Sequence, residues 1–238
     1  MKTDMKRKTF ALFLVCAISA MLFTGCDYEG EEWVSQIGSY FVGLMANDSG
    51  MKNIDRAHKK AFDSVFNDIE IFGAKLCVPM KVSELPDKFE LSNAYSTEGY
   101  IPLSENEPQG AELNGGLKRY RLDLYYDKEI RVAKVYIICN EDQSVEEGII
   151  CEIELGVLYT QPVWLGGQVE IHSGIDEVKE FLGEGNEFND IVFFSTSAFY
   201  TVFYTDGDRI LELTYGIQGD DLTFLLGYIR TYNNYEVI

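Results

Sequence analysis

The fold is decided by the stretch Arg119-Tyr120-Arg121-Leu122-Asp123-Leu124-Tyr125-Tyr126, in which apolar and charged side chains mostly alternate. A period of two predicts a β-strand with one buried face. A polar turn at 127–129 follows, and residues 130–139 and 149–155 form further apolar stretches separated by a charged loop. Three strands with polar connections of this kind predict an antiparallel meander.

Upstream of the meander, the sequence predicts a helix and two short strands. Residues 50–66 repeat apolar side chains at helical spacing, and Ser49 is placed to cap the first turn. The period then changes to two, which predicts strands at 69–71 and 75–78 around Gly73.

The region between these strands and the meander is less regular. Residues 82–89 predict one short helix, with Ser83 as its cap. Residues 92–117 are rich in Gly, Pro, Asn and Glu and show no periodicity, so we expect a long loop with one strand near Tyr100.

Downstream of the meander, residues 173–183 predict a helix with clear start and stop signals. Ser173 can cap its start, and Asp176 follows three residues later, close to the pattern of a capping box. Gly183 fits the left-handed residue that commonly ends a helix. The apolar residues at helical spacing are Ile175, Val178, Phe181 and Leu182.

Four strands are predicted after this helix. They occupy residues 191–195, 198–205, 209–217 and 222–231. Asp206-Gly207 lies between the second and the third strand, and this dipeptide favours a tight hairpin because both residues tolerate a positive φ.

The predicted elements divide the folded part of the chain into two. Gln161-Pro162 and Gly166-Gly167 indicate a boundary. We therefore expect an α+β protein made of two antiparallel β-rich parts, 50–160 and 164–238, each with short helices packed on a sheet face. The second part would consist of one helix and a four-stranded antiparallel sheet.

Residues 1–25 have the composition of a secretory signal peptide. Basic residues dominate the start, an apolar run extends from Phe10 to Phe23, and the small residues Thr24-Gly25 precede Cys26. The run is shorter than the roughly 20 apolar residues that a membrane-spanning helix needs.

The end of this leader, Leu22-Phe23-Thr24-Gly25-Cys26, resembles the lipobox of bacterial lipoproteins. The resemblance implies that Cys26 receives a diacylglycerol and becomes the N-terminus after cleavage, although Phe23 departs from the usual Leu, Val or Ile. Residues 26–49 would be a tether, which opens with the acidic stretch 27–32. We expect an exported protein, lipid-anchored to the cell membrane and facing outside the cytoplasm.

The chain is strongly acidic, with a net charge of −19. The leader carries four basic residues and one acid, so removing its charge of +3 leaves −22 on the remainder. This charge argues against a nucleic-acid partner, because phosphate binding needs a basic surface. It favours solubility and is compatible with cation binding.

Three cysteines, Cys77, Cys139 and Cys151, lie in apolar alternating segments. Free cysteines are commonly small core residues, which is the interpretation we favour. A disulfide, such as Cys139 with Cys151, is the alternative in an exported protein. His58 and His172 are the two histidines of the chain and neither is near a cysteine in sequence, so we predict no metal site and no cofactor.

Three stretches in the last third of the chain together form a distinctive pattern. They are Gly167–Val178, Phe181-Leu182-Gly183 and Asp206-Gly207-Asp208-Arg209-Ile210. This pattern resembles a module of bacterial lipoproteins, the SmpA/OmlA type, and the β-lactamase-inhibitor-protein-like fold. The module usually has glycine where this chain has His172, and x-Pro where it has Glu184-Gly185. The stretch around Gly73 and Ser83 is similar to the upstream half of Gram-positive surface lipoproteins that carry the module. The resemblance implies a binding or scaffolding role, usually with protein, and no shared catalytic site.

The two histidines, His172 and His58, can be considered as catalytic residues. His172 lies beside Ser173, as in some hydrolases, but Ser173 is placed to cap a helix and no nucleophile elbow is present in the sequence. His58 lies among basic residues, which favours a solvated helix face. We therefore predict no catalytic residue.

Three polar pairs offer clustered oxygens for calcium: Asn189-Asp190, Asp206 with Asp208, and Asp220-Asp221. None fits the twelve-residue calcium loop. Turn formation explains all three, because Asn and Asp favour turns.

The chain is rich in aromatic residues, with 15 Tyr and 15 Phe. Aromatic side chains with a polar tip suit recognition surfaces. The simpler interpretation is a half-solvated sheet. The candidate binding surface consists of five tyrosines on predicted strands: Tyr125, Tyr126, Tyr136, Tyr200 and Tyr204.

Together these features predict a lipid-anchored extracytoplasmic lipoprotein that binds a protein or envelope component through an exposed sheet face, without catalysis. An extracytoplasmic hydrolase is the first alternative, and a small-ligand or cation binder is the second. The expected partners are the membrane, through lipid on Cys26, and a protein or envelope component.

Overall fold

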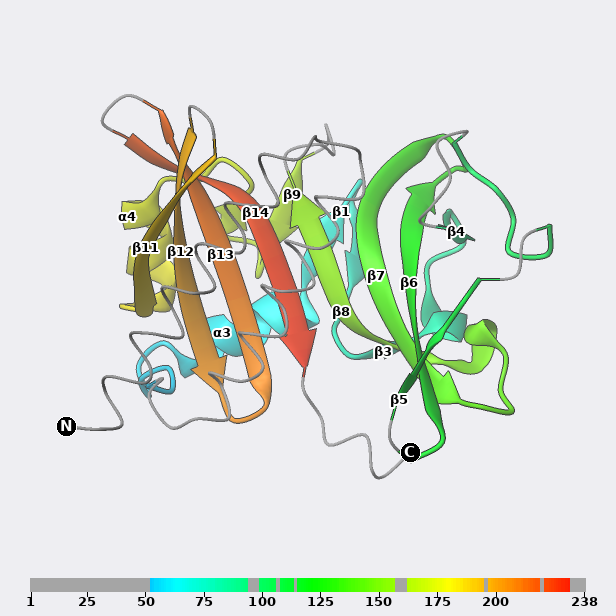
Figure 1. Ribbon diagram of the computed structural model, residues 1–238. Coiled ribbons are helices and arrows are strands. Elements are labelled where there is room, and N and C mark those ends of the chain that lie inside the picture. The colour runs from blue at the N-terminus through cyan, green and yellow to red at the C-terminus, as the bar shows by residue number, and fades with distance from the viewer. Residues whose placement is uncertain are drawn as a thin grey trace. The chain divides into compact units, whose positions relative to one another are not determined.

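The computed structural model describes residues 52–93, 99–105, 108–113, 115–156, 162–194, 197–218 and 221–231 (Figure 1). The side chains of residues 187–200 and 216–231 are not part of this description. The predictions for the leader, Cys26, the tether and the Ser49 cap lie outside the described residues. By their contacts, the residues from Lys52 onward group into one unit.

A large antiparallel sheet of ten strands, counted over the described residues, forms most of this unit. Eight strands lie in the order β11-β12-β13-β14-β8-β7-β6-β4, while β3 pairs with β8 and β5 pairs with β6. Their bounds are β3 Met80–Lys81, β4 Phe89–Asn93, β5 Ala111–Leu113, β6 Leu117–Tyr126, β7 Ile130–Asn140, β8 Ile149–Gly156, β11 Asn186–Phe194, β12 Ser197–Asp206, β13 Arg209–Gln218 and β14 Asp221–Thr231. The predicted meander is confirmed as β6, β7 and β8.

A smaller sheet has the order β10-β9-β1-β2. β1 (Ile69–Ile71) and β2 (Ala74–Leu76) form the hairpin predicted for this region. β9 (Val163–Leu165) and β10 (Val169–Glu170) form where the sequence indicated a boundary, and β9 pairs with β1. The glycines at 166–167 therefore turn the chain within a hairpin.

The helix α3 (Lys59–Asn67) starts later than the helix predicted at 50–66. The Asp55 carboxylate accepts hydrogen bonds from the backbone N–H groups of Ala57 (2.8 Å) and His58 (3.0 Å), which fixes a turn before the helix. Aspartate side chains compete with helix formation in this way, and helical spacing of apolar residues does not reveal it.

The prediction of a helix at 82–89 is wrong. Only the short 3-10 turn η1 (Val82–Glu84) forms, and Ser83 lies inside it instead of capping it. Leu85 has an extended backbone with ψ of 135°, because Pro86 disfavours the helical conformation in the residue before it. The chain then enters β4. A second 3-10 turn, η2 (Val145–Glu147), precedes β8.

The long loop predicted at 92–117 contains more regular structure than expected. It includes the end of β4 and the whole of β5. The strand expected near Tyr100 is a single bridge between Ser92 and Pro102. The Ser92 hydroxyl also accepts a hydrogen bond from the backbone N–H of Ile101 at 2.9 Å, which fastens this segment to β4.

The helix α4 (Ile175–Leu182) follows the sequence closely. Gly183 ends it with a φ of +76°, as predicted. The N-cap residue is Gly174, so the predicted capping box does not form. The Ser173 hydroxyl instead accepts a hydrogen bond from the backbone N–H of Glu170 at 3.1 Å.

The four strands predicted after α4 are found as β11 to β14. Their hairpin at residues 206–209 is confirmed, but its turn is shifted by one residue. Asp206 pairs with Arg209 as the last residues of β12 and β13, and Gly207 takes the positive φ of +64°. Glycine supplies this conformation without steric cost.

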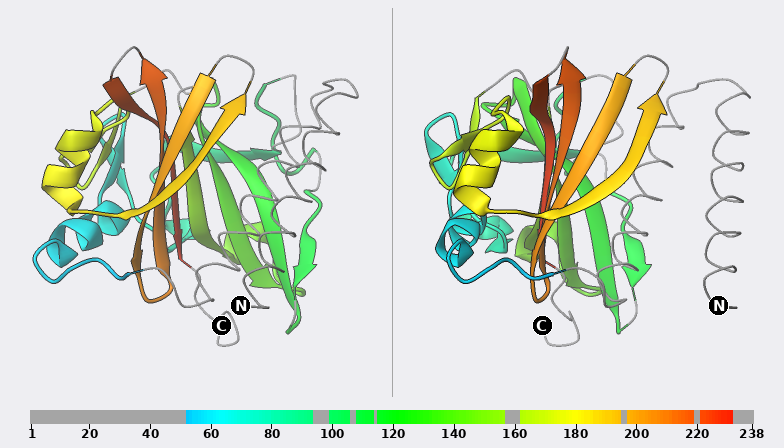
Figure 2. Two further views of the ribbon diagram at one scale, coloured as in Figure 1. Left: turned by 60° about the vertical axis from the view of Figure 1, so that its left-hand side comes forward. Right: turned by 90° about the vertical axis from the view of Figure 1, so that its left-hand side faces the viewer.

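One hydrophobic core connects both sheets and both helices. Phe62, Val65 and Phe66 of α3 and Val178 and Leu182 of α4 belong to the same buried cluster as strands from both ends of the sequence. Figure 2 shows α3 and α4 on the same side of the large sheet. The helices and the small sheet therefore share one apolar contact region.

The same arrangement occurs twice along the chain. Apart from the short strands β3 and β5 and the turn η2, which occur only in the first half, a hairpin, a helical segment and four antiparallel strands follow one another in each half. They are β1-β2, the 3-10 turn η1 and β4-β6-β7-β8, and then β9-β10, the helix α4 and β11-β12-β13-β14. The halves meet through their first strands, β1 and β9, and through their last strands, β8 and β14; both pairings are antiparallel. The two β-rich parts expected from the sequence are thus successive halves of shared sheets. Joining β8 to β14 removes two exposed strand edges.

Candidate functional site

The five tyrosines predicted as a binding surface do not share one face. Tyr126 stacks on Phe72 with ring centroids 4.2 Å apart, packed against the main core. Tyr204 is buried in that core, where its hydroxyl donates to the Gly183 carbonyl at 3.4 Å. Tyr204 therefore offers no exposed ring, whereas Tyr126 is half-buried. A period of two identifies a strand but not which of its faces is covered. The side chain of Tyr200 lies outside the described residues.

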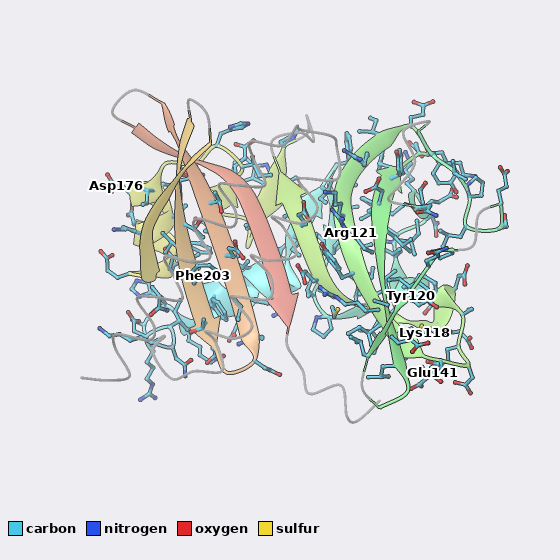
Figure 3. All side chains as sticks on the ribbon, viewed as in Figure 1. Lys118, Tyr120, Arg121, Glu141, Asp176 and Phe203 are labelled. Atoms are coloured by element: carbon cyan, nitrogen blue, oxygen red, sulfur yellow. The ribbon has the colours of Figure 1, made fainter. Side chains whose placement is uncertain are left out.

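Tyr125 and Tyr136 lie on the opposite side of the large sheet, among charged side chains. Alternation along a strand places these side chains away from the main core. The set, which we call the polar face, consists of Arg119, Arg121, Asp123, Tyr125, Arg131, Lys134, Tyr136, Glu152 and Glu154 (Figure 3, where Arg121 is labelled).

Ion pairs between neighbouring or next-neighbouring strands organise the polar face. The N–O distances are 2.9 Å for Arg119–Glu152, 3.2 Å for Arg131–Asp123 and 3.2 Å for Lys134–Glu154. The Arg119 guanidinium also lies 4.3 Å from the ring centroid of Tyr136. These contacts tie β6, β7 and β8 together through their side chains as well as their backbones.

Burial dominates the electrostatics of the polar face. Asp123 is 0% exposed, and loss of water raises the pKa of its carboxyl while Arg131 and Lys134 oppose that shift. Burial likewise raises the pKa of Tyr136. Tyr125 and Tyr136 are 6% and 8% exposed, so they do not offer an open recognition surface in this structure.

An exposed aromatic side chain lies on the small sheet instead. Val163 and Leu165 of β9 are buried in the core, so Trp164 between them points to the outer side and is 37% exposed. Glu70 on β1 and Glu170 on β10 lie directly opposite Trp164 on either side. Directly opposed side chains have Cβ atoms about 4.5–5.5 Å apart.

The outer side of the small sheet carries one row of four such side chains, which we call the Trp164 face. In the order β2-β1-β9-β10, they are Lys75, Glu70, Trp164 and Glu170. Lys75 forms an ion pair with Asp68 at 2.7 Å. Within the described part of the chain, the carboxylates of Glu70 and Glu170 accept no hydrogen bond and form no ion pair. Glu70 nevertheless lies opposite Lys75 on β2; the hydrogen bond to Asp68 raises the pKa of that ammonium, and the charge of Glu70 helps to raise it further.

The Trp164 face was not predicted from the sequence. Pro162 and Gly166-Gly167 indicate a linker, and three-residue strands give too short a pattern to outweigh such signals. The alternation of Val163, Trp164 and Leu165 was the available signal, since two aliphatic residues around one aromatic residue fit a strand with a single buried side.

The histidine and serine positions have local structural roles. His58 Nδ1 lies 2.9 Å from the Asp55 carboxylate in the turn before α3. Ser173 binds the backbone of Glu170, and His172 has a φ of +91° in the same turn. A left-handed backbone at position 172 explains why glycine would fit there.

Of the polar pairs considered for calcium, only Asp206 with Asp208 lies among the described side chains. Asp206 forms ion pairs with Lys59 at 2.5 Å and Arg209 at 2.6 Å, which link α3 to the β12–β13 hairpin. The side chains of Asn189-Asp190 and Asp220-Asp221 lie outside the described residues. Among the residues that are described, no group of three or more His, Cys, Asp or Glu could hold a metal ion.

The cysteines at 77, 139 and 151 are free thiols. Cys139 belongs to the main core, whereas Cys151 belongs to a small cluster on the polar face with Tyr136 and Ile138. Because their side chains lie on opposite sides of the sheet, the alternative disulfide between them does not form.

Comparisons of the chain with protein-family models, with curated proteins and with solved structures gave no match. None of the helices in the described ranges has the length and apolar character needed to cross a membrane.

Proposed function

We propose that this chain is an exported lipoprotein, anchored to the cell membrane through lipid on Cys26, that binds a protein or envelope component through the Trp164 face without catalysing a reaction. The observation that carries the binding role is the exposed indole of Trp164 between two carboxylates. Single exposed apolar side chains are common on proteins. The two acids beside Trp164 favour a role in recognition, because they would select partners by charge while the indole makes the apolar contact.

The support beneath the Trp164 face also favours recognition. Ile69 and Ile71 of β1 and Leu165 of β9 are almost completely buried on the inner side of the same strands. A surface held by buried strands loses little conformational entropy when a partner binds, which improves affinity.

The lipid anchor would hold the Trp164 face near the membrane surface. One acyl chain gives reversible membrane attachment, whereas two chains hold a protein stably. The acidic stretch 27–32 would be repelled by an anionic membrane, so the folded unit would stand away from it.

The anchor is tested by Cys26→Ala, with Cys16→Ala in the leader as the matched control. We expect Cys26→Ala to lose metabolic lipid labelling and to leave the membrane fraction, while Cys16→Ala keeps both. Lipid labelling of Cys26→Ala at the parent level would contradict the anchor.

The binding role is tested by photo-crosslinking in living cells. A photoreactive residue at Gln168, exposed in the turn between β9 and β10, reports on the Trp164 face. The same residue at Leu113, which is also 37% exposed but lies on β5, is the control. We expect position 168 to capture one defined envelope component, and Trp164→Ala to abolish the capture. Equal capture from both positions would count against the proposal.

We also propose that residues 164–238 are related to the SmpA/OmlA type of module. The order of one helix followed by the four strands β11 to β14 supports this relationship. We further propose that short helices pack on a sheet face in each half.

A further inference from the structure

Because the two halves of the fold have a similar order of elements, the residues that each half contributes to the Trp164 face can be compared position by position. The antiparallel pairing of β1 with β9 places Glu70 opposite Trp164, with one paired residue on each side of them. These two residues therefore occupy equivalent positions, as do Lys75 and Glu170 on the second strand of each hairpin. The first half contributes an acid and a base, whereas the second contributes an indole and an acid.

Elsewhere in the chain, an aromatic ring beside a glutamate holds a cation. Tyr136 and Glu152 lie directly opposite each other on β7 and β8. The Arg119 guanidinium lies 4.3 Å from the Tyr136 ring centroid and 2.9 Å from the Glu152 carboxylate. One guanidinium thus contacts both the face of the ring and the carboxylate.

A second instance lies near the edge of the large sheet. The Lys128 ammonium lies 5.7 Å from the ring centroid of Tyr100 and 3.2 Å from the Glu90 carboxylate. The Tyr100 hydroxyl donates to the same carboxylate at 2.6 Å. This protein therefore combines an aromatic ring, a glutamate and a cation at two separate places.

The Trp164 face contains the ring and two glutamates, but within the described residues no cation lies over the indole. Lys75, the base of the row, is engaged by Asp68. We infer that the Trp164 face binds an arginine side chain from a basic segment of a partner protein, stacked on the indole between Glu70 and Glu170. This inference rests on the proposed binding role and names the partner's chemistry.

The dimensions and charge of the face fit this partner. Neighbouring strands lie about 4.8 Å apart, so the two glutamate-bearing strands are separated by about 10 Å, with the indole between them. A planar guanidinium can stack on a ring while its N–H groups reach carboxylates at its edge. The net charge of −19 would draw basic segments toward the molecule over longer distances.

A sugar ring is the other common occupant of an exposed tryptophan. Its hydroxyl groups are neutral, so a sugar would not explain why two carboxylates without ion-pair partners flank the indole. The experiment therefore compares a cationic peptide, a neutral peptide of the same shape and an oligosaccharide.

The test uses the full-length chain with Trp33→Phe, so that fluorescence reports on Trp164 alone. The probes are a Gly-Arg-Gly-Arg-Gly peptide, the same peptide with citrulline in place of arginine, and maltohexaose. We expect saturable quenching by the arginine peptide, weakened at 0.5 M salt. We expect the citrulline peptide to bind about three- to tenfold more weakly, and maltohexaose to leave the emission unchanged.

Variants locate the site. Glu70→Gln and Glu170→Gln should each weaken the arginine peptide about threefold, as expected for loss of one partly exposed charge contact. Glu129→Gln, an exposed acid in the β6–β7 turn, should change nothing. For Trp164→Ala and Trp164→Phe, binding is followed by calorimetry; we expect a loss of about tenfold for alanine and partial recovery for phenylalanine. Circular dichroism checks that each variant is folded.

The outcomes separate the inference from the proposed function. Equal affinity for the arginine and citrulline peptides, or quenching by maltohexaose alone, would overturn the arginine inference. Capture of an envelope component at position 168 would then still stand, with a partner of other chemistry. Loss of that capture, with arginine binding intact, would leave the arginine inference correct and the proposed envelope role wrong.

Discussion

Replacing Arg131 by methionine tests the electrostatics of the polar face. The Arg131 guanidinium lies 3.2 Å from the Asp123 carboxylate, which is almost completely buried, while the Arg131 side chain is 30% exposed. Methionine keeps most of the apolar stem but leaves the carboxylate without its ion-pair partner. Removal of one partner from a buried pair costs about 3–5 kcal/mol. Because Arg131 is partly exposed and Lys134 still favours the charged carboxylate, we expect about 3 kcal/mol at pH 7.

This loss should depend on pH in one direction. Burial raises the pKa of Asp123 above the ordinary value of 3.8, so the folded state binds a proton at higher pH than the unfolded state. The stability contribution of this group therefore increases as the pH falls through the folded-state pKa and is lost as the pH rises through it. Without Arg131 the shift is larger, so the destabilisation by Arg131→Met should shrink between pH 7 and pH 4.

Urea unfolding followed by circular dichroism at several pH values measures the effect. Lys118→Met, which removes a half-buried base from the same sheet, is the control and should cost less than about 1 kcal/mol. The double variant Asp123→Asn/Arg131→Met should recover part of the loss, because no buried charge is left. A loss below about 1 kcal/mol for Arg131→Met at pH 7, or a loss that does not change with pH, would refute the reasoning.

Two further changes test other parts of the fold by the same unfolding measurement. Hydrogen bonds from Lys59 and Arg209 lower the pKa of Asp206, so its contribution is present above pH 3.8 and is lost as the pH falls through the lower folded-state pKa. Asp206→Asn should therefore cost about 1 kcal/mol at pH 7 and progressively less in acid, and a constant cost would argue for lost packing instead. His172 has a φ of +91°, so His172→Gly should raise the unfolding free energy by about 0.5 kcal/mol, the relief of backbone strain being partly offset by greater freedom of the unfolded chain. His172→Val should lower it, and a gain from valine would contradict the strain.

The sequence predicted local elements well where local chemistry controls them. The alternation of residues 119–126 identified β6, and Gly183 and Gly207 took the positive φ values that end α4 and turn the β12–β13 hairpin. The failures arose where a neighbouring group overrides the pattern. Pro86 stopped the helix expected at 82–89, and the Asp55 side chain delayed the start of α3.

The candidate site was less predictable than the fold. Tyr125, Tyr136 and Tyr204 were correctly placed on strands, but all three are buried. A strand pattern states that two faces differ and does not state what covers each of them. Trp164 was missed because its strand has three residues and lies between turn signals.

The sequence by itself determined the acidic character, the meander β6 to β8, the helix α4 and the strands β11 to β14, because each depends on residues close together in the chain. The lipoprotein leader stays a prediction from the sequence. The tertiary structure alone decided that β8 pairs with β14 and β1 with β9, which turned two expected parts into halves of shared sheets. Such pairings join residues far apart in sequence. Backbone hydrogen bonds are the same whatever the side chains, so the sequence of one strand does not identify its partner. The same pairings placed Glu70 and Glu170 beside Trp164, so the face proposed for binding exists only in the folded chain.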